Sequence, residues 1–272
     1  MKYLNLGCGS HFSTNSEWTN LDFTSNSTNV IEHNLLSGIP FSDNTYDLVY
    51  HSHVLEHFSQ NDGKKLIKEC FRVLKPDGVL RIAIPDLESI TENYLHFLRK
   101  GMEDLSDSTN KANYEWMKIE MYDQTVRNTT GGEMLNYLAQ TSILNENFVY
   151  KRIGEEGREL RKKLLQSNTS ASNSAKKNRN SYKQKLKNYL IKKLHINETY
   201  QQIGAFRLGG EIHQWMYDRY SLHLLLNECG GYEIQIRDAF TSYIMHWKDY
   251  NLDGWDTIIR KPDSLFIECK KK

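Results

Sequence analysis

Short apolar runs alternate with a helical pattern over the first 86 residues of the chain. The apolar runs predict buried strands at residues 2–6, 18–23, 29–33, 46–50 and 79–84. Before the last of these, residues 62–74 repeat apolar side chains at spacings of one, three and four, which predicts one face of a helix. Strands that alternate with helices predict an α/β fold built on a parallel sheet.

The middle of the chain has a different pattern. Residues 87–210 are mostly polar and helix-prone, so we expect a helical insertion over the sheet that serves as a lid, a substrate-binding part or a dimerisation arm. A flexible stretch is expected around residues 165–180, where Ser and Asn are dense between basic segments. The predicted core then consists of residues 1–86 and 211–272.

The strand and helix pattern returns after this insertion. Apolar positions from Tyr220 to Leu226 predict a buried helix, and two strands follow at residues 232–240 and 264–269. The loop between these strands carries Trp247 and Trp255, and large aromatic side chains at such positions more often belong to a core than to a sugar platform.

Composition changes this picture little. Lys and Arg number 35 against 34 Asp and Glu, so net charge indicates no partner. The chain lacks the ~20 consecutive apolar residues of a membrane-spanning helix and a signal-like start, so we expect a cytoplasmic protein without a transmembrane segment. The four cysteines lack the paired spacings of zinc sites or disulfide frameworks, which predicts reduced thiols.

The first strand ends in a glycine turn, LNLGCGS. Glycines at positions 7 and 9 let a ligand approach the backbone closely. Asp22 ends the second strand about fifteen residues later, where a carboxylate can accept both hydroxyls of a ribose. A dinucleotide oxidoreductase is the rival interpretation, but it would need a third glycine where His11 stands.

Four blocks of sequence, in this order, resemble the class I S-adenosylmethionine-dependent methyltransferases of the type 11 group. They are LNLGCGS, WTNLDF, IEHNLLSGIPFSDNTYDLVYHSHVLEHF and RVLKPDGVLRIAIPD. The resemblance implies a Rossmann-like class I methyltransferase fold, with a mostly parallel seven-stranded sheet and a C-terminal antiparallel strand. It also implies S-adenosyl-L-methionine as the cofactor and S-adenosyl-L-homocysteine as the product.

The same resemblance implies roles for individual residues. Gly7 and Gly9 would lie under the methionyl end of the cofactor, while Asp22 would bind the ribose. Phe23 would pack on adenine, and Asn34 with Leu35 would meet the adenine edge. Residues 51–53 would line the sulfonium and acceptor side. The full implied set is Asn5, Leu6, Gly7, Cys8, Gly9, Asp22, Phe23, Asn34, Leu35, His51, Ser52 and His53.

Three positions depart from the family pattern. Asn5 replaces the acidic residue before the glycine turn, and His11 replaces the third glycine. Asn34 replaces the usual Asp at the adenine edge, although an amide oxygen can still accept from the adenine amine.

Methyl transfer to a hydroxyl needs a general base, because the proton is held tightly. His53, just after the fourth predicted strand, is the first choice, and His57 and His213 are the other candidates; each of the three could instead be a structural histidine. We expect no metal site, since His51, His53 and His57 span a strand end and a helix start with no carboxylate cluster beside them.

The C-terminal blocks GGEIHQWMYDRYSLHLLLNECGGYE and NLDGWDTIIRKPDSLFIECKK resemble methyltransferases encoded with bacterial surface-polysaccharide enzymes. This resemblance implies O-methylation of a capsule or lipopolysaccharide precursor, at a sugar or phosphoryl group, a phosphoramidate included. The basic segment at residues 158–187 could attract such an anionic acceptor, or could simply be solvated.

Two other functions remain open: a nucleic-acid methyltransferase that grips its substrate with the basic segment, and a non-catalytic cofactor-binding assembly protein. We expect no nucleic-acid partner, and the insertion leaves a homodimer open.

Overall fold

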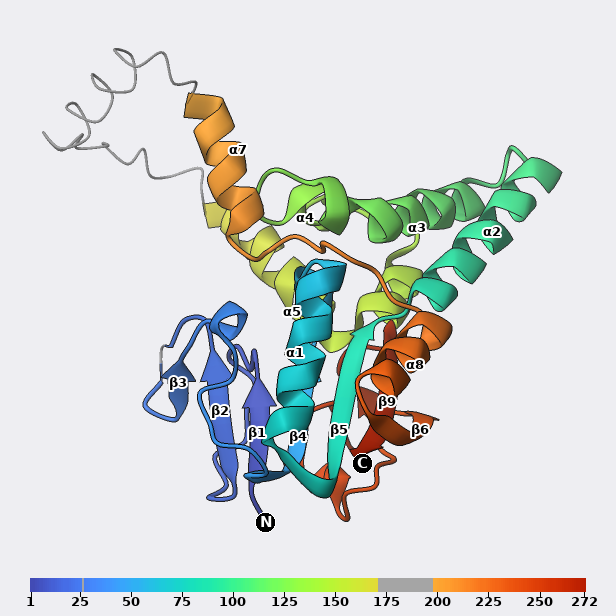
Figure 1. Ribbon diagram of the computed structural model, residues 1–272. Helices are drawn as coiled ribbons and strands as arrows, with labels where there is room; N and C mark the ends of the chain where they lie inside the picture. The colour runs from blue at the N-terminus through green and yellow to red at the C-terminus, as the bar shows by residue number, and fades with distance from the viewer. Residues whose placement is uncertain (26, 171–197) are drawn as a thin grey trace, which may run out of the picture.

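The computed structural model describes residues 1–25, 27–170 and 198–272, and it contains a seven-stranded sheet of order β3-β2-β1-β4-β5-β9-β6 (Figure 1). The strands are β1 (Tyr3–Leu6), β2 (Trp18–Asp22), β3 (Val30–Glu32), β4 (Tyr46–Ser52), β5 (Leu74–Pro85), β6 (Gly231–Arg237) and β9 (Ser264–Lys271). Strands β1 to β5 pair in parallel, whereas β9 runs antiparallel to both β5 and β6. The predicted Rossmann-like α/β fold with one C-terminal antiparallel strand is confirmed.

Two helices, α1 (Gln60–Val73) and α8 (Arg219–Glu228), cover one face of the sheet. The apolar side chains of α1 pack against buried strand residues such as Leu6 and Val49. Helix α1 begins two residues earlier than predicted, because Ser59 Oγ accepts from the Asp62 amide and caps it. It ends at Val73, since β5 already starts at Leu74.

The loop between β6 and β9 covers the opposite face. It carries the short helix η4 (Trp247–Tyr250) and a two-stranded ribbon of β7 (Gly254–Trp255) and β8 (Ile258–Ile259), which the sequence pattern did not indicate. Trp247 is 3% exposed and packs against Trp18 and Tyr50 of the sheet. The expectation that Trp247 belongs to a core is confirmed.

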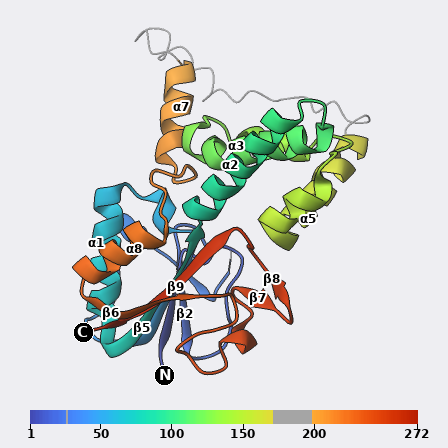
Figure 2. The same ribbon diagram turned by 90° about the vertical axis from the view of Figure 1, so that its right-hand side faces the viewer.

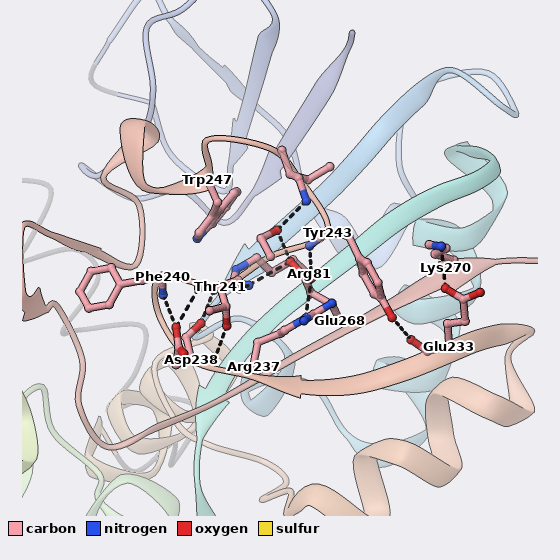
Figure 3. Close-up of polar contacts among 12 residues, drawn as sticks. Arg81, Glu233, Arg237, Asp238, Phe240, Thr241, Tyr243, Trp247, Glu268 and Lys270 are labelled. Atoms are coloured by element: carbon pink, nitrogen blue, oxygen red, sulfur yellow. Dashed lines mark hydrogen bonds and ion pairs between the residues drawn. The ribbon is translucent and has the colours of Figure 1, made fainter.

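A buried ionic network anchors this loop to the sheet (Figure 3). Arg81 of β5 is fully buried, and its guanidinium pairs with Asp253 Oδ2 at 2.7 Å and Glu268 Oε1 at 2.9 Å. It also donates to the carbonyl oxygens of Thr241 and Asp238, each at 2.9 Å. Burial would lower the pKa of Arg81, but the two carboxylates raise it, so the network holds its full charge.

A group of helices stands over the carboxyl edge of the parallel strands (Figures 1 and 2). These helices are α2 (Leu87–Glu103), α3 (Ser108–Val126), α4 (Gly132–Leu138), α5 (Glu146–Ser170) and α7 (Glu198–Leu208). Side chains of α2 to α5 form a separate small core around Trp116 and Met117, both fully buried. The group falls within residues 87–210, and its role as lid, substrate part or dimerisation arm stays a prediction.

Part of the predicted flexible stretch, residues 171–180, lies outside the described residues. Within the parts that are described, no helix is both long and apolar enough to cross a membrane. The four cysteines are all free, as their spacing predicted.

Candidate functional site

The glycine turn is shaped by two residues with positive φ. Gly7 has φ +60°, and a Cβ there would lie 2.4 Å from Val54 Cγ2, so packing against the segment after β4 requires glycine. Gly9 has φ +55°, and a Cβ there would meet no atom within 4 Å. The backbone at Gly9 therefore faces open space, where a ligand can approach it. His11 Nε2 lies 2.8 Å from Asn251 O, which ties the end of the turn to the loop of the opposite face.

Asp22 lies beside this turn at the carboxyl end of β2. Its Oδ2 accepts from the Gly9 amide at 2.7 Å and its Oδ1 from the Thr24 amide at 3.2 Å. Each oxygen keeps a second lone pair for a ribose hydroxyl. Phe23, the next residue, is 63% exposed and offers a free aromatic face. The open turn, the carboxylate and this ring fit the sulfonium nucleoside that the resemblance implies.

The adenine edge differs in detail from the expectation. Asn34 caps the short helix η1 (Leu35–Ser37), and its Oδ1 accepts from the Leu36 amide at 3.0 Å. The amide oxygen expected to receive the adenine amine therefore already accepts one hydrogen bond, and its second lone pair, the Asn34 amide nitrogen and the Leu35 backbone are the groups left for adenine. Leu35 also packs against the core beneath.

Three other residues of the implied cofactor set are buried before any ligand binds. Asn5 is 1% exposed and donates from Nδ2 to Asn20 Oδ1 at 3.4 Å, so its side chain joins β1 to β2. Leu6 is fully buried. Burial raises the pKa of Cys8 to about 12, which keeps it a thiol. Only the backbone of these residues can meet a cofactor in this arrangement, and that contact stays a prediction.

His51 does not face the open side where it was expected. It is 0% exposed, and neither ring nitrogen has a hydrogen-bond partner among the described residues. Burial lowers its pKa to about 4, opposed by the nearby Glu56. The reason is the β-strand alternation, which turns the side chain at position 51 to the helix-covered face while its half-buried neighbour Ser52 points the other way.

His53 is the candidate base that meets open space. Its φ is +54°, a left-handed conformation that costs a non-glycine residue of order 1–3 kcal/mol and is typical of functional sites. Its Nδ1 lies 3.3 Å from Glu56 Oε1, and its Nε2 lies 2.8 Å from Ser264 Oγ. Because a carboxylate only accepts, its charge favours the proton on Nδ1 even though the contact is not a full hydrogen bond, which leaves the Nε2 lone pair facing Ser264.

His53 lines a cavity of about 250 Å³ between the sheet edge and the helical group. The other lining side chains that bear on chemistry are Gln124, Arg127, Glu156, Lys261 and Asp263. Arg127 is held by Glu211 at 2.9 Å, whereas Lys261 pairs more loosely, with Glu156 at 3.9 Å. The cavity therefore joins a histidine to both positive and negative groups.

Glu56 is the central residue of this region, and the sequence analysis did not single it out. It is 1% exposed, and neither carboxylate oxygen accepts a hydrogen bond within the described parts of the chain. One ligand atom each of Glu56, His57 and His213 lies within 4.8 Å of the others. His51 and His53, which sequence reasoning considered as metal ligands, are not part of this group. We call the set His51, His53, Glu56, His57, His213 and Tyr217 the Glu56 cluster.

Backbone hydrogen bonds bring the cluster together from distant segments. The Glu56 carbonyl accepts from the amides of Gln214 and Trp215 at 2.7 and 3.2 Å. The His213 amide donates to Gln124 O of α3 at 2.8 Å. His57 Nδ1 lies 3.1 Å from Ile212 O. The segment that returns from the helical group to the core is thus fixed against the short helix η2 (Leu55–His57).

Burial and charge set the protonation of the cluster. Burial lowers the pKa of His213 to about 3 and raises that of Tyr217 to about 12. Burial would also raise the pKa of Glu56, but His53, His213 and His57 outweigh it and lower that pKa. At neutral pH the cluster therefore holds an ionised Glu56, a neutral His213 and a protonated Tyr217, whose hydroxyl has no partner in the ranges described.

The basic segment gives little support to an anion-binding surface where it is described. Arg161 is 3% exposed and donates to Leu138 O and Gln140 O, so it holds α4 to α5. Arg158 pairs with Glu155 at 3.1 Å. The basic residues from position 176 to 187 lie outside the described residues.

Residues 4–82 match a protein family described as a methyltransferase domain. A comparison with curated protein sequences finds no match. Among solved structures, the whole chain overlays 82% of a SAM-dependent methyltransferase from Thermotoga maritima, with 11% identity and a TM-score of 0.39. The chain is also similar to a SAM-dependent methyltransferase from Archaeoglobus fulgidus: 99% of this chain covers 86% of the Archaeoglobus chain, with 12% identity and a TM-score of 0.39.

A chain from a Haloferax volcanii complex with the Trm112 methyltransferase activator matches 36% of this chain, at 17% identity and a TM-score of 0.27, and only half of that chain is spanned. Because all three TM-scores are low, the fold assignment rests on the strand order of the sheet itself. The strand order and the methyltransferase-domain match together support a class I methyltransferase with S-adenosylmethionine as its cofactor.

Proposed function

We propose that the protein transfers a methyl group to a hydroxyl of a small anionic glycan precursor that binds in the cavity beside His53. The observation that carries this proposal is the position of His53, whose strained backbone sets its ring between buried Glu56 and the cavity. Bound S-adenosylmethionine supplies the electrophilic methyl group. The chain's own task is to align the acceptor, exclude water and take one proton.

His53 takes the proton in this proposal. Glu56 faces Nδ1 and favours the tautomer in which Nε2 is the base, as carboxylates do for catalytic histidines. The Ser264 hydroxyl lies 2.8 Å from Nε2. In this proposal an acceptor hydroxyl either takes this position beside Nε2 or passes its proton to Nε2 through Ser264. Glu56 therefore acts as a positioning residue and His53 as the catalytic one.

The size and charge of the cavity support the acceptor class. At about 250 Å³ it is smaller than the ~300–1,000 Å³ typical of drug-sized ligand sites, so one sugar-sized group suits it. Lys261 and Arg127 can meet a phosphoryl or carboxylate oxygen, and Gln124 can meet hydroxyls. The C-terminal blocks resemble surface-polysaccharide methyltransferases, and this resemblance implies a capsule or lipopolysaccharide precursor as the acceptor. Such an acceptor agrees with the charge of the cavity.

The test is transfer of a tritiated methyl group from S-adenosylmethionine to a panel of nucleotide sugars and sugar phosphates, with an RNA transcript as the contrasting substrate. We expect label in a carbohydrate, and we expect His53→Gln to lower kcat by roughly 10²–10⁴ while the Kd of the cofactor changes less than about threefold. The exposed His223→Gln on α8 is the matched control and should retain full turnover.

Two results would overturn the proposal in different ways. Label in the RNA alone would contradict the glycan acceptor and favour a nucleic-acid methyltransferase. Unchanged kcat in His53→Gln, with a carbohydrate labelled, would remove His53 as the base but keep the acceptor class.

A further inference from the structure

The buried carboxylate of Glu56 needs a positive partner that its surroundings supply only in part. Its two oxygens accept no hydrogen bond from the described residues, and its contact with His53 Nδ1 is 3.3 Å. Buried charges in proteins are stable when they are paired and hydrogen-bonded or when they coordinate a metal. Two more imidazoles, those of His57 and His213, converge on the same carboxylate.

We propose that Glu56, His57 and His213 bind one divalent transition-metal ion, with Zn²⁺ as the best match. Two imidazole nitrogens and one carboxylate oxygen are a common donor set for zinc, whereas Mg²⁺ and Ca²⁺ prefer oxygen ligands throughout. The ligand atoms lie within 4.8 Å of one another. Zinc bonds of ~2.0–2.1 Å in tetrahedral geometry place ligand atoms about 3.3 Å apart. Side-chain rotations that bring the ligand atoms closer together by up to about 1.5 Å therefore complete the site.

The surroundings orient the ligands for this role. His57 Nδ1 donates to Ile212 O, which fixes the tautomer and leaves the Nε2 lone pair available, the usual arrangement for a metal-bound histidine. The rings of His57 and His213 meet edge to face, with centroids 5.0 Å apart, so they approach one point from two directions. Glu56 Oε1 faces His53, and the carboxylate has a second oxygen for the ion.

The position of the site indicates what the ion does. Glu56 and His57 belong to η2 of the core, while His213 belongs to the segment that returns from the helical group. One ion bound to all three fastens that segment to the core beside His53, in addition to the two backbone bonds to Glu56 O. This inference concerns binding and does not depend on the proposed methyl transfer.

The test is calorimetric titration of ZnCl₂ into the full chain after treatment with EDTA and dialysis. We expect one ion per chain, and at least tenfold weaker binding in His57→Gln and in His213→Gln, since each loses one of three ligands. His223→Gln, an exposed histidine on α8, should bind zinc as the wild type does. A site made by scattered surface histidines would instead be weakened as much by His223→Gln as by the others.

Thermal denaturation keeps the inference testable if a variant folds poorly. Zinc at about a hundredfold excess over its Kd should raise the Tm of the wild type by about 5 °C or more, and should not raise the Tm of Glu56→Gln. No zinc binding by the wild type, or a zinc affinity in His57→Gln and His213→Gln equal to that of the wild type, would contradict the inference.

Discussion

Two buried charged clusters lie in the core of this protein, and they differ in how completely their charges are paired. In the Arg81 cluster, formed by Arg81, Asp253 and Glu268, each carboxylate contacts the guanidinium. Glu268 also accepts from the Tyr243 amide and pairs with Arg237, as Figure 3 shows. In the Glu56 cluster the carboxylate, both nitrogens of His51 and the Tyr217 hydroxyl have no hydrogen-bond partner within the described chain.

We infer from this difference that the Arg81 cluster supports the fold and that the Glu56 cluster serves a function. A fully paired buried network rigidifies the structure around it, and the Arg81 cluster fastens the β6–β9 loop to the sheet. A buried polar group without a partner costs free energy, so its retention indicates a use beyond packing. The Glu56 cluster lies beside the carboxyl edge of the parallel strands, where ligands of such sheets bind.

The largest effect should follow from breaking the paired cluster. Arg81→Met leaves Asp253 and Glu268 as buried carboxylates without their shared guanidinium, and among the described residues Arg237 is then the remaining cation paired with Glu268. We expect the free energy of unfolding to fall by about 3–5 kcal/mol, measured by urea denaturation in EDTA. A loss below about 1 kcal/mol would contradict the structural role of this network.

The matched change in the other cluster should be mild. Glu56→Gln keeps the side-chain volume and removes a carboxylate that accepts no hydrogen bond from the residues described. We expect its cost to stay below about 1.5 kcal/mol, the upper value for one ordinary hydrogen bond. A cost equal to that of Arg81→Met would mean that the Glu56 cluster is a structural network as well.

A smaller effect concerns acid stability. The pKa of His51 is lowered to about 4 in the folded protein and is near 6.5 when unfolded. Between these values the unfolded chain binds the extra proton, so stability is full above pH 6.5 and falls as the pH decreases. We expect this histidine to add up to ~1.4 kcal/mol per pH unit to the slope of the free energy of unfolding against pH between pH 6.5 and 5, measured in EDTA.

His51→Leu should remove that share of the slope, whereas the exposed His223→Leu should leave it unchanged. An identical slope in His51→Leu and the wild type would show that His51 is not held neutral by burial.

Strand and helix periodicity was enough to predict the sheet, because buried parallel strands and amphipathic helices follow from local pattern. The β7–β8 ribbon was missed, since each strand has two residues, which is too short for a periodic pattern. The start of β5 was misplaced by five residues, because the turn at Pro76 was taken as the end of the helix rather than as part of the strand's entry.

The site was predictable as far as it depends on the glycine turn and on the strand ends. Asp22 lies beside the glycine turn, as its spacing predicted, while Asn34 uses its amide oxygen for a cap. Glu56 was visible in the segment HSHVLEHF, but its burial depends on the short helix η2 and on residues 212–215, about 155 positions away. No local period encodes such a contact, and this is why the Glu56 cluster required the structure.

Calorimetric titration of S-adenosylmethionine, and separately of NAD, into the wild type and Asp22→Ala tests the central claim most directly. We expect the wild type to bind S-adenosylmethionine and not NAD, and Asp22→Ala to lose at least tenfold in affinity, about 1.4 kcal/mol, because the ribose hydroxyls lose their carboxylate. The exposed Asp249→Ala should bind as the wild type does. Binding of NAD alone, binding of neither, or an unchanged Kd in Asp22→Ala would contradict the assignment of the glycine turn and Asp22 to this cofactor.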